Sequence, residues 1–423
     1  MTVAPEASAG TPPADSGPPR AALYGAYCTG LFSMGLMDFF VLLVPLWALS
    51  INATATEIGL LVGARSLLPL LFAIHGGALM DRLGVRQVML VTVALVCLLA
   101  PAYPAMRWFP ALLALQLVVG MGTTYAWIGA QTLIARVSRG DTTHIGRFSF
   151  AGRIGTFTAP IIGGVLWDFT GPWISFLSVS LWCVLLLVCI WIVPCGEKSE
   201  RDTAQTRQAF RLQDTLPKVS DYVQAAALLG IPMVAMTVMI NFLRNTTSSV
   251  QGSFYVTYLN EIGLTGTAIG ILFAAVEAAS GLSSLGSAFY LRFIKAHWLI
   301  ITLSATAIAL IAITPLLGGV FTVLLIAQVL RGGAQGLIQP ILFSLQAKSV
   351  PLNAQGSVVG LRVTVNRLSS VTVPPLMGVA ADLAGLQASF LIVGGTLLAI
   401  VAIVALWVKR SPAFAAAEAA QAP

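Results

Sequence analysis

Apolar runs of about twenty residues recur along almost the whole of this 423-residue sequence. A helix of that length spans a hydrocarbon core about 30 Å thick, because each helical residue adds about 1.5 Å. The composition agrees: 57% of the residues are hydrophobic and only 9% are charged, against about 25% charged in a typical soluble domain. The sequence therefore predicts an integral membrane protein of the all-α class.

Twelve such runs predict twelve transmembrane helices. They lie at about residues 21–49, 56–80, 86–106, 108–136, 143–167, 172–194, 222–259, 266–291, 297–317, 320–348, 354–381 and 386–408. With the N-terminus in the cytoplasm, the inner loops and tails hold sixteen Lys and Arg residues, whereas the outer loops hold only Arg107. This asymmetry predicts a plasma membrane protein, in a bacterium an inner membrane protein, with both termini cytoplasmic. The net charge of +7 is then explained by anionic lipid and needs no nucleic-acid partner.

One charged segment divides the chain. Gly196 to Lys218 carries nine charged residues and separates two groups of six predicted helices. The predicted organisation is a disordered cytoplasmic tail at 1–20, an N-terminal six-helix half at 21–194, a cytoplasmic linker at 195–220, a C-terminal six-helix half at 221–410 and a second cytoplasmic tail at 411–423.

The two groups of helices carry matching residues at nearly constant offsets. The pairs are Arg153–Arg367, Pro160–Pro374, Gly164–Gly378 and Asp168–Asp382 at an offset of 214, Gln116–Gln328 and Gly120–Gly332 at 212, and Ile58–Ile269 and Gly59–Gly270 at 211. These matches indicate a duplicated unit and therefore two pseudo-symmetric halves. Halves related in this way hold a substrate at mid-membrane between them and rock about it, so that the site opens to each side in turn.

The short connection after the second predicted helix carries a recognisable pattern. Its residues are Gly77, Leu79, Asp81, Arg82, Gly84 and Arg86. Together with twelve helices in two related halves, this pattern resembles the major facilitator superfamily of membrane transporters over about residues 22–409. The resemblance implies that the segment is a gating loop, in which Asp81 pairs with charges at a neighbouring helix end when the cytoplasmic side is closed. The alternative is an ordinary turn that obeys the positive-inside rule.

The fifth predicted helix carries a second pattern, formed by Gly146, Gly155, Pro160, Gly163 and Gly164. It resembles a motif of the drug and metabolite efflux members of that superfamily, which exchange substrate for protons. The alternative is helix packing through small residues, which let two backbones approach closely. One feature of many proton-coupled exporters differs, since Gln116 occupies the position of an Arg four residues before the first glycine of the fourth helix.

Ionisable residues inside the predicted helices are the best site candidates, because charge is costly in lipid. The proton-coupling candidates are Asp38 and Glu277, and the substrate-binding candidates are Arg65, Arg244, Arg331, Arg367, Gln116, Tyr125 and Trp127. Similar depths predict that Asp38 pairs with Arg65 and, less closely, that Glu277 pairs with Arg244. Each pair could instead be purely structural. The excess of Arg favours an anionic substrate over a lipophilic cation.

The leading hypothesis is a proton-coupled exporter of a small organic metabolite or drug, with an anionic one favoured, that works by alternating access. An uptake symporter for an organic anion is the alternative, and a non-transporting receptor or an intramembrane enzyme is a remote one. We expect no enzymatic activity, no cofactor and no bound metal, because neither His-Glu-x-x-His, Gly-x-Ser-x-Gly nor a metal-spaced cluster occurs. The expected partners are a small-molecule substrate, protons and membrane lipid, and the expected functional unit is a monomer.

Overall fold

The computed structural model describes residues 19–139, 141–193, 227–350, 355–412 and 414. Within them it describes only the backbone of residues 73–78, 81–82, 142, 288, 347–348 and 355–357. Every regular element in these ranges is a helix, so the predicted all-α class is confirmed. The tail at 1–18, the linker predicted at 195–220 and most of the C-terminal tail lie outside the described residues.

The N-terminal half consists of six membrane crossings. Its elements are α1 (Arg20–Ser50), α2 (Ala55–Leu83), α3 (Val85–Leu99) with η1 (Ala100–Ala105), α4 (Phe109–Val137) and α5 (Thr142–Ile192). Helix α5 supplies two of the crossings, because Gly171 has a φ of 77° and breaks the helix there. Such a positive φ is accessible to glycine at little cost, and Pro172 then starts the next helical stretch.

The C-terminal half contains η3 (Leu228–Gly230), α8 (Pro232–Val250), the π-helical turn η4 (Gln251–Tyr255), α9 (Val256–Glu261), α10 (Gly266–Ser284), α11 (Ser287–Tyr290), α12 (Ala296–Ala312), η5 (Thr314–Leu317), α13 (Phe321–Ser349), α14 (Gln355–Ala384) and α15 (Leu386–Arg410). By length and composition alone, eight helices of the described chain could cross a membrane. Helix α5 counts twice, and α8 to α9, α12 and α14 complete the predicted twelve crossings. The run predicted at 266–291 is shorter than expected, because α10 ends at Ser284.

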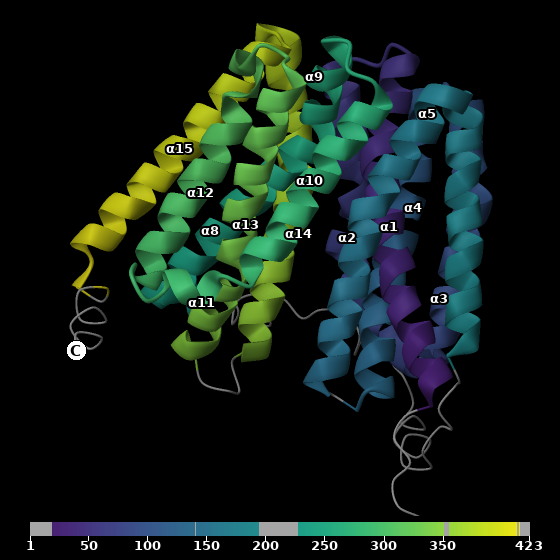
Figure 1. Cartoon of the computed structure of the whole chain (residues 1–423), viewed down its shortest axis with the longest axis horizontal. Coiled ribbons are helices and arrows are strands. Elements are labelled where there is room, and N and C mark those ends of the chain that lie inside the picture. The colour runs from purple at the N-terminus through teal and green to yellow at the C-terminus, as the bar shows by residue number, and fades with distance from the viewer. Residues whose placement is uncertain (1–18, 140, 194–226, 351–354, 413, 415–423) are drawn as a thin grey trace, which may run out of the picture.

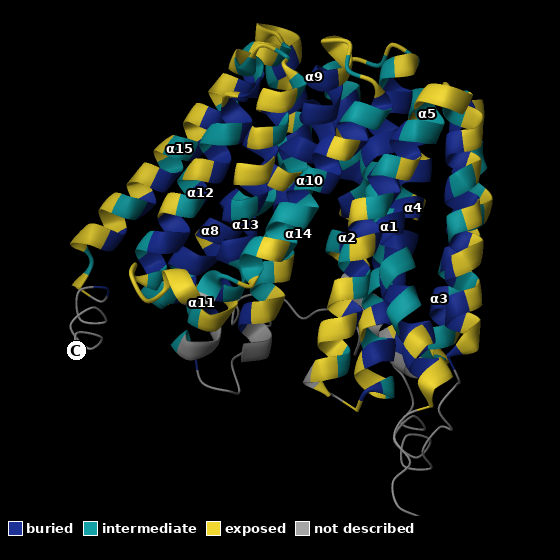
Figure 2. Cartoon of the chain, in the orientation of Figure 1, coloured by how far each residue is buried: buried dark blue, intermediate teal, exposed yellow. Residues whose placement is uncertain are grey.

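The two halves lie side by side (Figure 1), and the start of α1 and the end of α15 lie at the same end of the bundle. Buried residues gather inside each half and between the halves, while exposed residues cover the periphery (Figure 2). The exposed side chains include many large apolar ones, such as Leu98, Leu181 and Ile403. This outward apolar surface is the arrangement that lipid requires.

Two close helix crossings join the halves: α2 crosses α14, and α5 crosses α10. A Cβ atom added at Gly59 would lie 2.3 Å from the Pro374 carbonyl oxygen, and one added at Gly270 would lie 2.3 Å from the Pro160 carbonyl oxygen. Neither position has room for a side chain. These residues are the matched pairs of the sequence repeat, so the internal symmetry of the sequence reappears as two equivalent contacts between the halves.

A carboxylate closes each crossing at one end of the bundle, here called the latched end. Asp168 of α5 accepts hydrogen bonds from the backbone N–H groups of Gly266 and Thr267, both at 2.7 Å. Asp382 of α14 accepts from the backbone N–H groups of Ala55 at 3.1 Å and Thr56 at 2.9 Å. Each carboxylate therefore caps the first turn of a helix in the opposite half, where N–H groups are unpaired and the helix dipole is positive.

We predict that the double substitution Asp168→Asn and Asp382→Asn opens the latched end. An amide carries no charge to interact with the helix dipole and keeps only one acceptor oxygen for two N–H groups, so each helix start should lose about 0.3–1 kcal/mol. The measurement is the distance between spin labels at Asn52 and Glu261, which are exposed at this end on opposite halves. The distance distribution of the double variant should shift to longer values.

Glu57→Gln is the matched control. Glu57 caps its own helix, where it accepts a hydrogen bond from the Thr54 backbone N–H at 2.8 Å, and it makes no bond to the other half. Its substitution removes one carboxylate charge at the same end and should leave the label distance unchanged. A double Asp variant with the wild-type distance would show that the carboxylates do not hold this end closed.

Candidate functional site

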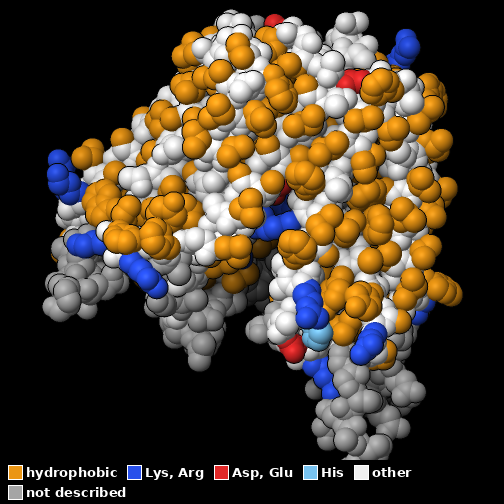
Figure 3. All heavy atoms as spheres, in the orientation of Figure 1, with side chains coloured by type: hydrophobic (Ala, Val, Ile, Leu, Met, Phe, Trp, Pro, Cys, Tyr) orange, Lys and Arg blue, Asp and Glu red, His pale blue; other side chains and the backbone are white. Residues whose placement is uncertain are grey.

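A cavity of about 270 Å³ lies between the two halves. It is near the lower limit of pockets that hold small ligands. Figure 3 shows the surface hollowed between the halves, with basic side chains visible in the hollow. The N-terminal half lines the cavity with residues of α1, α2, α4 and α5, and the C-terminal half with residues of α8, η4, α10, α13 and α14.

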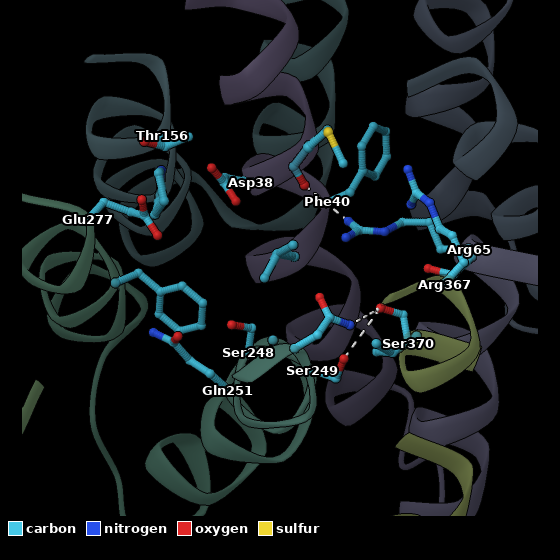
Figure 4. A pocket seen from close by; sticks show the side chains of 18 of the residues that line it. Asp38, Phe40, Arg65, Thr156, Ser248, Ser249, Gln251, Glu277, Arg367 and Ser370 are labelled. Atoms are coloured by element: carbon cyan, nitrogen blue, oxygen red, sulfur yellow. Dashed lines mark hydrogen bonds between the residues drawn. The ribbon is translucent and has the colours of Figure 1, made fainter. Parts of the chain in front are cut away.

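Four charged side chains line this cavity: Asp38, Arg65, Glu277 and Arg367. All four are only half-buried. The two carboxylates lie toward one side and the two guanidinium groups toward the other (Figure 4). The cavity is therefore electrically polarised, with a negative and a positive wall.

The ion pairs differ from those predicted from depth. Glu277 forms its salt bridge with Arg153 of α5, at 4.0 Å between Oε2 and Nη1, and not with Arg244. The close α5–α10 crossing explains this partner. Arg65 donates from Nη1 to the carbonyl oxygen of Met37 at 3.0 Å. Asp38 interacts electrostatically with Arg65 and Glu277, but within the described part of the chain it forms no hydrogen bond or salt bridge.

A polar wall of the cavity was missed by the sequence reasoning. It consists of Asn245, Ser248 and Ser249 of α8, Gln251 of η4 and Ser370 of α14. The Asn245 amide donates to the Ser370 hydroxyl at 3.0 Å, and the Ser249 hydroxyl donates to the same oxygen at 3.4 Å. The signal was available, because residues 244–253 are a polar run inside an otherwise apolar span. A π-helical turn such as η4 often marks a functional site.

Several predicted substrate-binding residues do not line the cavity. Arg331 is fully buried and donates to the side-chain oxygens of Gln328, at 3.0 Å, and Gln251. Through Gln251 it supports the cavity wall from behind. Arg244 is half-buried beside this wall, without lining it.

Of the three substrate-binding candidates on α4, two pack against neighbouring helices and one lines the cavity. Tyr125 donates to the carbonyl oxygen of Phe72 at 3.1 Å, and Trp127 stacks on Phe148 with 5.9 Å between ring centroids. Both therefore belong to the packing of α4 against α2 and α5. Gln116 does line the cavity, and its side-chain oxygen accepts a hydrogen bond from the Tyr103 hydroxyl at 2.9 Å.

The predicted gating loop is only partly described. Gly77, Asp81 and Arg82 belong to the segments of which only the backbone is described. Gly84 has a φ of 90°, which favours glycine between α2 and α3. Arg86 donates to the Trp191 carbonyl oxygen at 2.8 Å and lies over its ring, which ties α3 to the end of α5.

The glycine pattern of α5 faces two different helices. A Cβ atom at Gly155 would lie 2.0 Å from the Leu31 carbonyl oxygen of α1, and one at Gly163 would lie 3.2 Å from the Phe39 ring. Gly164 instead approaches α10, where a Cβ atom would lie 2.1 Å from the Gly266 carbonyl oxygen. Gly146 differs, because a Cβ atom there would meet nothing within 4 Å among the described residues. Its part in the pattern therefore stays a prediction.

The sequence matches the model of the Major Facilitator Superfamily over residues 26–246 and 237–423. The chain belongs to this superfamily. The chain is thus an integral membrane protein, and the similar proteins described below are transporters. The fold prediction of twelve helices in two halves is confirmed with it.

Curated relatives are distant and match only part of the chain. The vesicular acetylcholine transporter of Torpedo marmorata is 23% identical over 209 residues, which are 48% of this chain and 41% of that protein. The lactose permease of Klebsiella oxytoca is 25% identical over 192 residues, which are 42% of this chain and 46% of the permease. The matched regions span less than half the length of these relatives.

Solved structures share the fold over nearly the whole chain. The nucleoside transporter NupG superposes with a TM-score of 0.76 at 13% identity, covering 92% of this chain and 100% of that one. A bacterial homologue of the human lysosomal transporter Spinster, in an inward-facing and unoccupied conformation, superposes with a TM-score of 0.66 at 16% identity, covering 92% and 96%. At these identities the likeness establishes the fold alone.

We predict that Tyr103→Phe destabilises the N-terminal half by roughly 1–3 kcal/mol, because it leaves the buried Gln116 oxygen without its donor. The ring itself stays, including its stacking on Phe176 at 4.9 Å between centroids. The measurement is thermal unfolding of the purified protein in detergent. Tyr24→Phe removes the same oxygen from an exposed side chain and should leave the unfolding temperature unchanged. Equal unfolding temperatures for both variants would contradict a structural role for the Tyr103–Gln116 bond.

Proposed function

We propose that this protein is a proton-coupled exporter of a small polar organic molecule, and that it works by alternating access. The observation that carries the proposal is the polarised cavity between the halves, in which Asp38 has no hydrogen-bond or salt-bridge partner in the described chain. A carboxylate inside a membrane protein needs a function, since its burial is costly. A proton taken up and released there would couple transport to the proton gradient.

Glu277 is the second proton-coupling candidate. It is held by Arg153, which belongs to the opposite half, so its environment depends on the α5–α10 crossing. Rocking of the halves would move Arg153 relative to Glu277 and change the relative stability of the charged and neutral carboxyl. Asp38 has no such partner to replace, and we therefore assign it the leading role.

The two crossings and their capping carboxylates support the alternating-access part of the proposal. They close the cavity at the latched end, while the hollow in Figure 3 lies between the halves toward the opposite end. The beginning of α1 and the end of α15 lie at that opposite end (Figure 1). We propose that this end is cytoplasmic, in a bacterial inner membrane, and that the monomer is the functional unit.

The proposed substrate is small and polar. The cavity size and its wall of Asn, Ser and Gln side chains support this choice. The names of the similar proteins point the same way, since acetylcholine, lactose and nucleosides are small polar organic molecules. The direction of transport rests on the likeness of the α5 glycine pattern to efflux transporters. Uptake of an organic anion is the alternative, favoured by the two arginines of the cavity.

We predict that Asp38→Asn abolishes proton-coupled transport and retains substrate binding, because an amide cannot exchange a proton but can still donate and accept hydrogen bonds. Glu277→Gln should impair coupling less completely. The measurement uses proteoliposomes with an imposed pH gradient and an internal pH-sensitive dye. Gluconate, ribose 5-phosphate and their neutral analogues sorbitol and ribose are supplied as probe solutes. Solute-dependent proton movement should be present in the wild type and absent in Asp38→Asn.

Glu261→Gln is the control, since Glu261 is an exposed carboxylate at the latched end and does not line the cavity. It should couple normally. Solute-dependent proton movement in both cavity variants at the wild-type rate would contradict the proposed coupling sites. Proton movement that accompanies solute entry into vesicles, in the orientation that corresponds to uptake, would favour the symporter instead.

A further inference from the structure

The internal repeat relates two arginines of the cavity region. Arg153 on α5 and Arg367 on α14 occupy equivalent positions, separated by 214 residues. Arg153 is neutralised by Glu277 at 4.0 Å across the α5–α10 crossing. The equivalent of Glu277 at the α2–α14 crossing, 211 residues earlier, is Ser66, and Ser66 lines the same cavity. The second crossing therefore keeps the arginine of the first but lacks its carboxylate.

Arg367 has no acidic partner and no hydrogen-bond partner among the described residues. The charged residue that acts on it electrostatically is another cation, Arg65 of α2. Arg65 donates from one nitrogen to the Met37 carbonyl oxygen, and its remaining N–H groups have no hydrogen-bond partner within the described part of the chain. Figure 4 shows the two side chains beside each other on one side of the cavity. Two partly buried cations near each other are unfavourable unless anions neutralise both. Asp38 acts electrostatically on Arg65, which leaves Arg367 without a counter-ion among the described residues.

We propose that Arg65 and Arg367 form an anion site, in which they bind a carboxylate or phosphate group of the transported molecule. The planar guanidinium groups offer paired donors that match the oxygens of either group. The anion takes the place that Glu277 fills at the equivalent crossing. The proposal names the substrate class of the exporter proposed above, and so rests on that function for its physiological meaning.

The neighbouring polar wall defines the rest of the molecule. Ser370 lies three residues after Arg367 on α14 and is joined by hydrogen bonds to Asn245 and Ser249 of α8. These hydroxyl and amide groups can hydrogen-bond to hydroxyl or amide groups of a ligand. Asp38, which forms no salt bridge in the described chain, lies on the opposite side of the cavity and repels a second negative charge there (Figure 4). The ligand is therefore an organic acid with one anionic end and a neutral, polar body.

The anion site also depends on conformation. Arg65 belongs to one half and Arg367 to the other, and their helices cross where a Cβ atom at Gly63 would lie 2.8 Å from the Val371 carbonyl oxygen. Rocking that opens the latched end separates α2 from α14 and so divides the two cations. An anion held by both is held best in the conformation described here, and it is released when the crossing opens.

The test is equilibrium binding to the purified full-length protein in detergent at pH 7, without any gradient. The probes are gluconate against sorbitol, and ribose 5-phosphate against ribose, and binding is measured as the rise in unfolding temperature with probe concentration. At least one acid should stabilise the wild type, and its neutral analogue should not. The better of the two acids distinguishes a carboxylate from a phosphate. Arg65→Gln and Arg367→Gln should each weaken its binding about tenfold or more, as expected for a lost charge-assisted hydrogen bond.

Arg362→Gln is the matched control on the same helix. Arg362 lies over the Phe343 ring at 4.0 Å and does not line the cavity, so its substitution should leave acid binding unchanged. Ser66→Glu tests the symmetry argument directly, because it supplies the missing carboxylate while both arginines remain. It should reduce acid binding at least as strongly as Arg367→Gln.

Wild-type affinity in the Arg65→Gln and Arg367→Gln variants would overturn the anion site, as would a wild type that neither acid stabilises better than its neutral analogue. Loss of acid binding in Arg362→Gln to the same degree would also overturn it, because the effect would then be one of general charge. This binding assay is independent of the proteoliposome assay. Acid binding that depends on both arginines, without solute-dependent proton movement, would support the anion site and contradict the proposed coupling.

Discussion

The contact between the two halves rests on backbone approach at two helix crossings, and the rest of the structure depends on it. Glycines at these crossings allow one helix to reach the carbonyl groups of another, as Gly59 does at Pro374 and Gly270 does at Pro160. Two carboxylates, Asp168 and Asp382, then each cap a helix that begins in the opposite half. Such contacts are strong enough to define one conformation, and they involve few enough groups to be exchanged for another. The rocking motion that we propose requires both properties.

The cavity follows from these crossings. At the α5–α10 crossing an arginine pairs with a carboxylate, whereas at the equivalent α2–α14 crossing the position of that carboxylate is occupied by Ser66. The two copies of the duplicated unit thus share the packing residues of their crossings but differ in the charged residues beside them. In a medium of low dielectric constant this difference is large, because a charge without a counter-ion is far less stable than a paired one. The polarised cavity is therefore the part of the site in which the two halves are no longer equivalent.

The polar wall of the cavity depends on a different feature, the local geometry at the end of α8. A π-helical turn at Gln251–Tyr255 changes the direction in which the following side chains point, and the buried Arg331 fixes Gln251 from behind. Sequence reasoning placed Arg331 among the residues that touch substrate, because it considered depth in the membrane and not direction around the helix. The position of Tyr125 and Trp127 differs from expectation for the same reason: both residues pack α4 against its neighbours.

The sequence by itself determined the twelve crossings, the all-helical fold and the duplication of the halves. Lipid forces this outcome, since it accepts only apolar runs in which every backbone group is paired within the helix. The sequence also marked Asp38, Arg65, Glu277 and Arg367, because charge inside such a run is conspicuous. Only the tertiary structure decided which charges meet. Ion pairs form across helix crossings. Where α5 crosses α10, Glu277 pairs with Arg153, and where α2 crosses α14, Arg367 lies beside Arg65. Depth in the membrane can be read from residue number, but the angle of a side chain around its helix and the identity of its neighbour depend on how the halves pack.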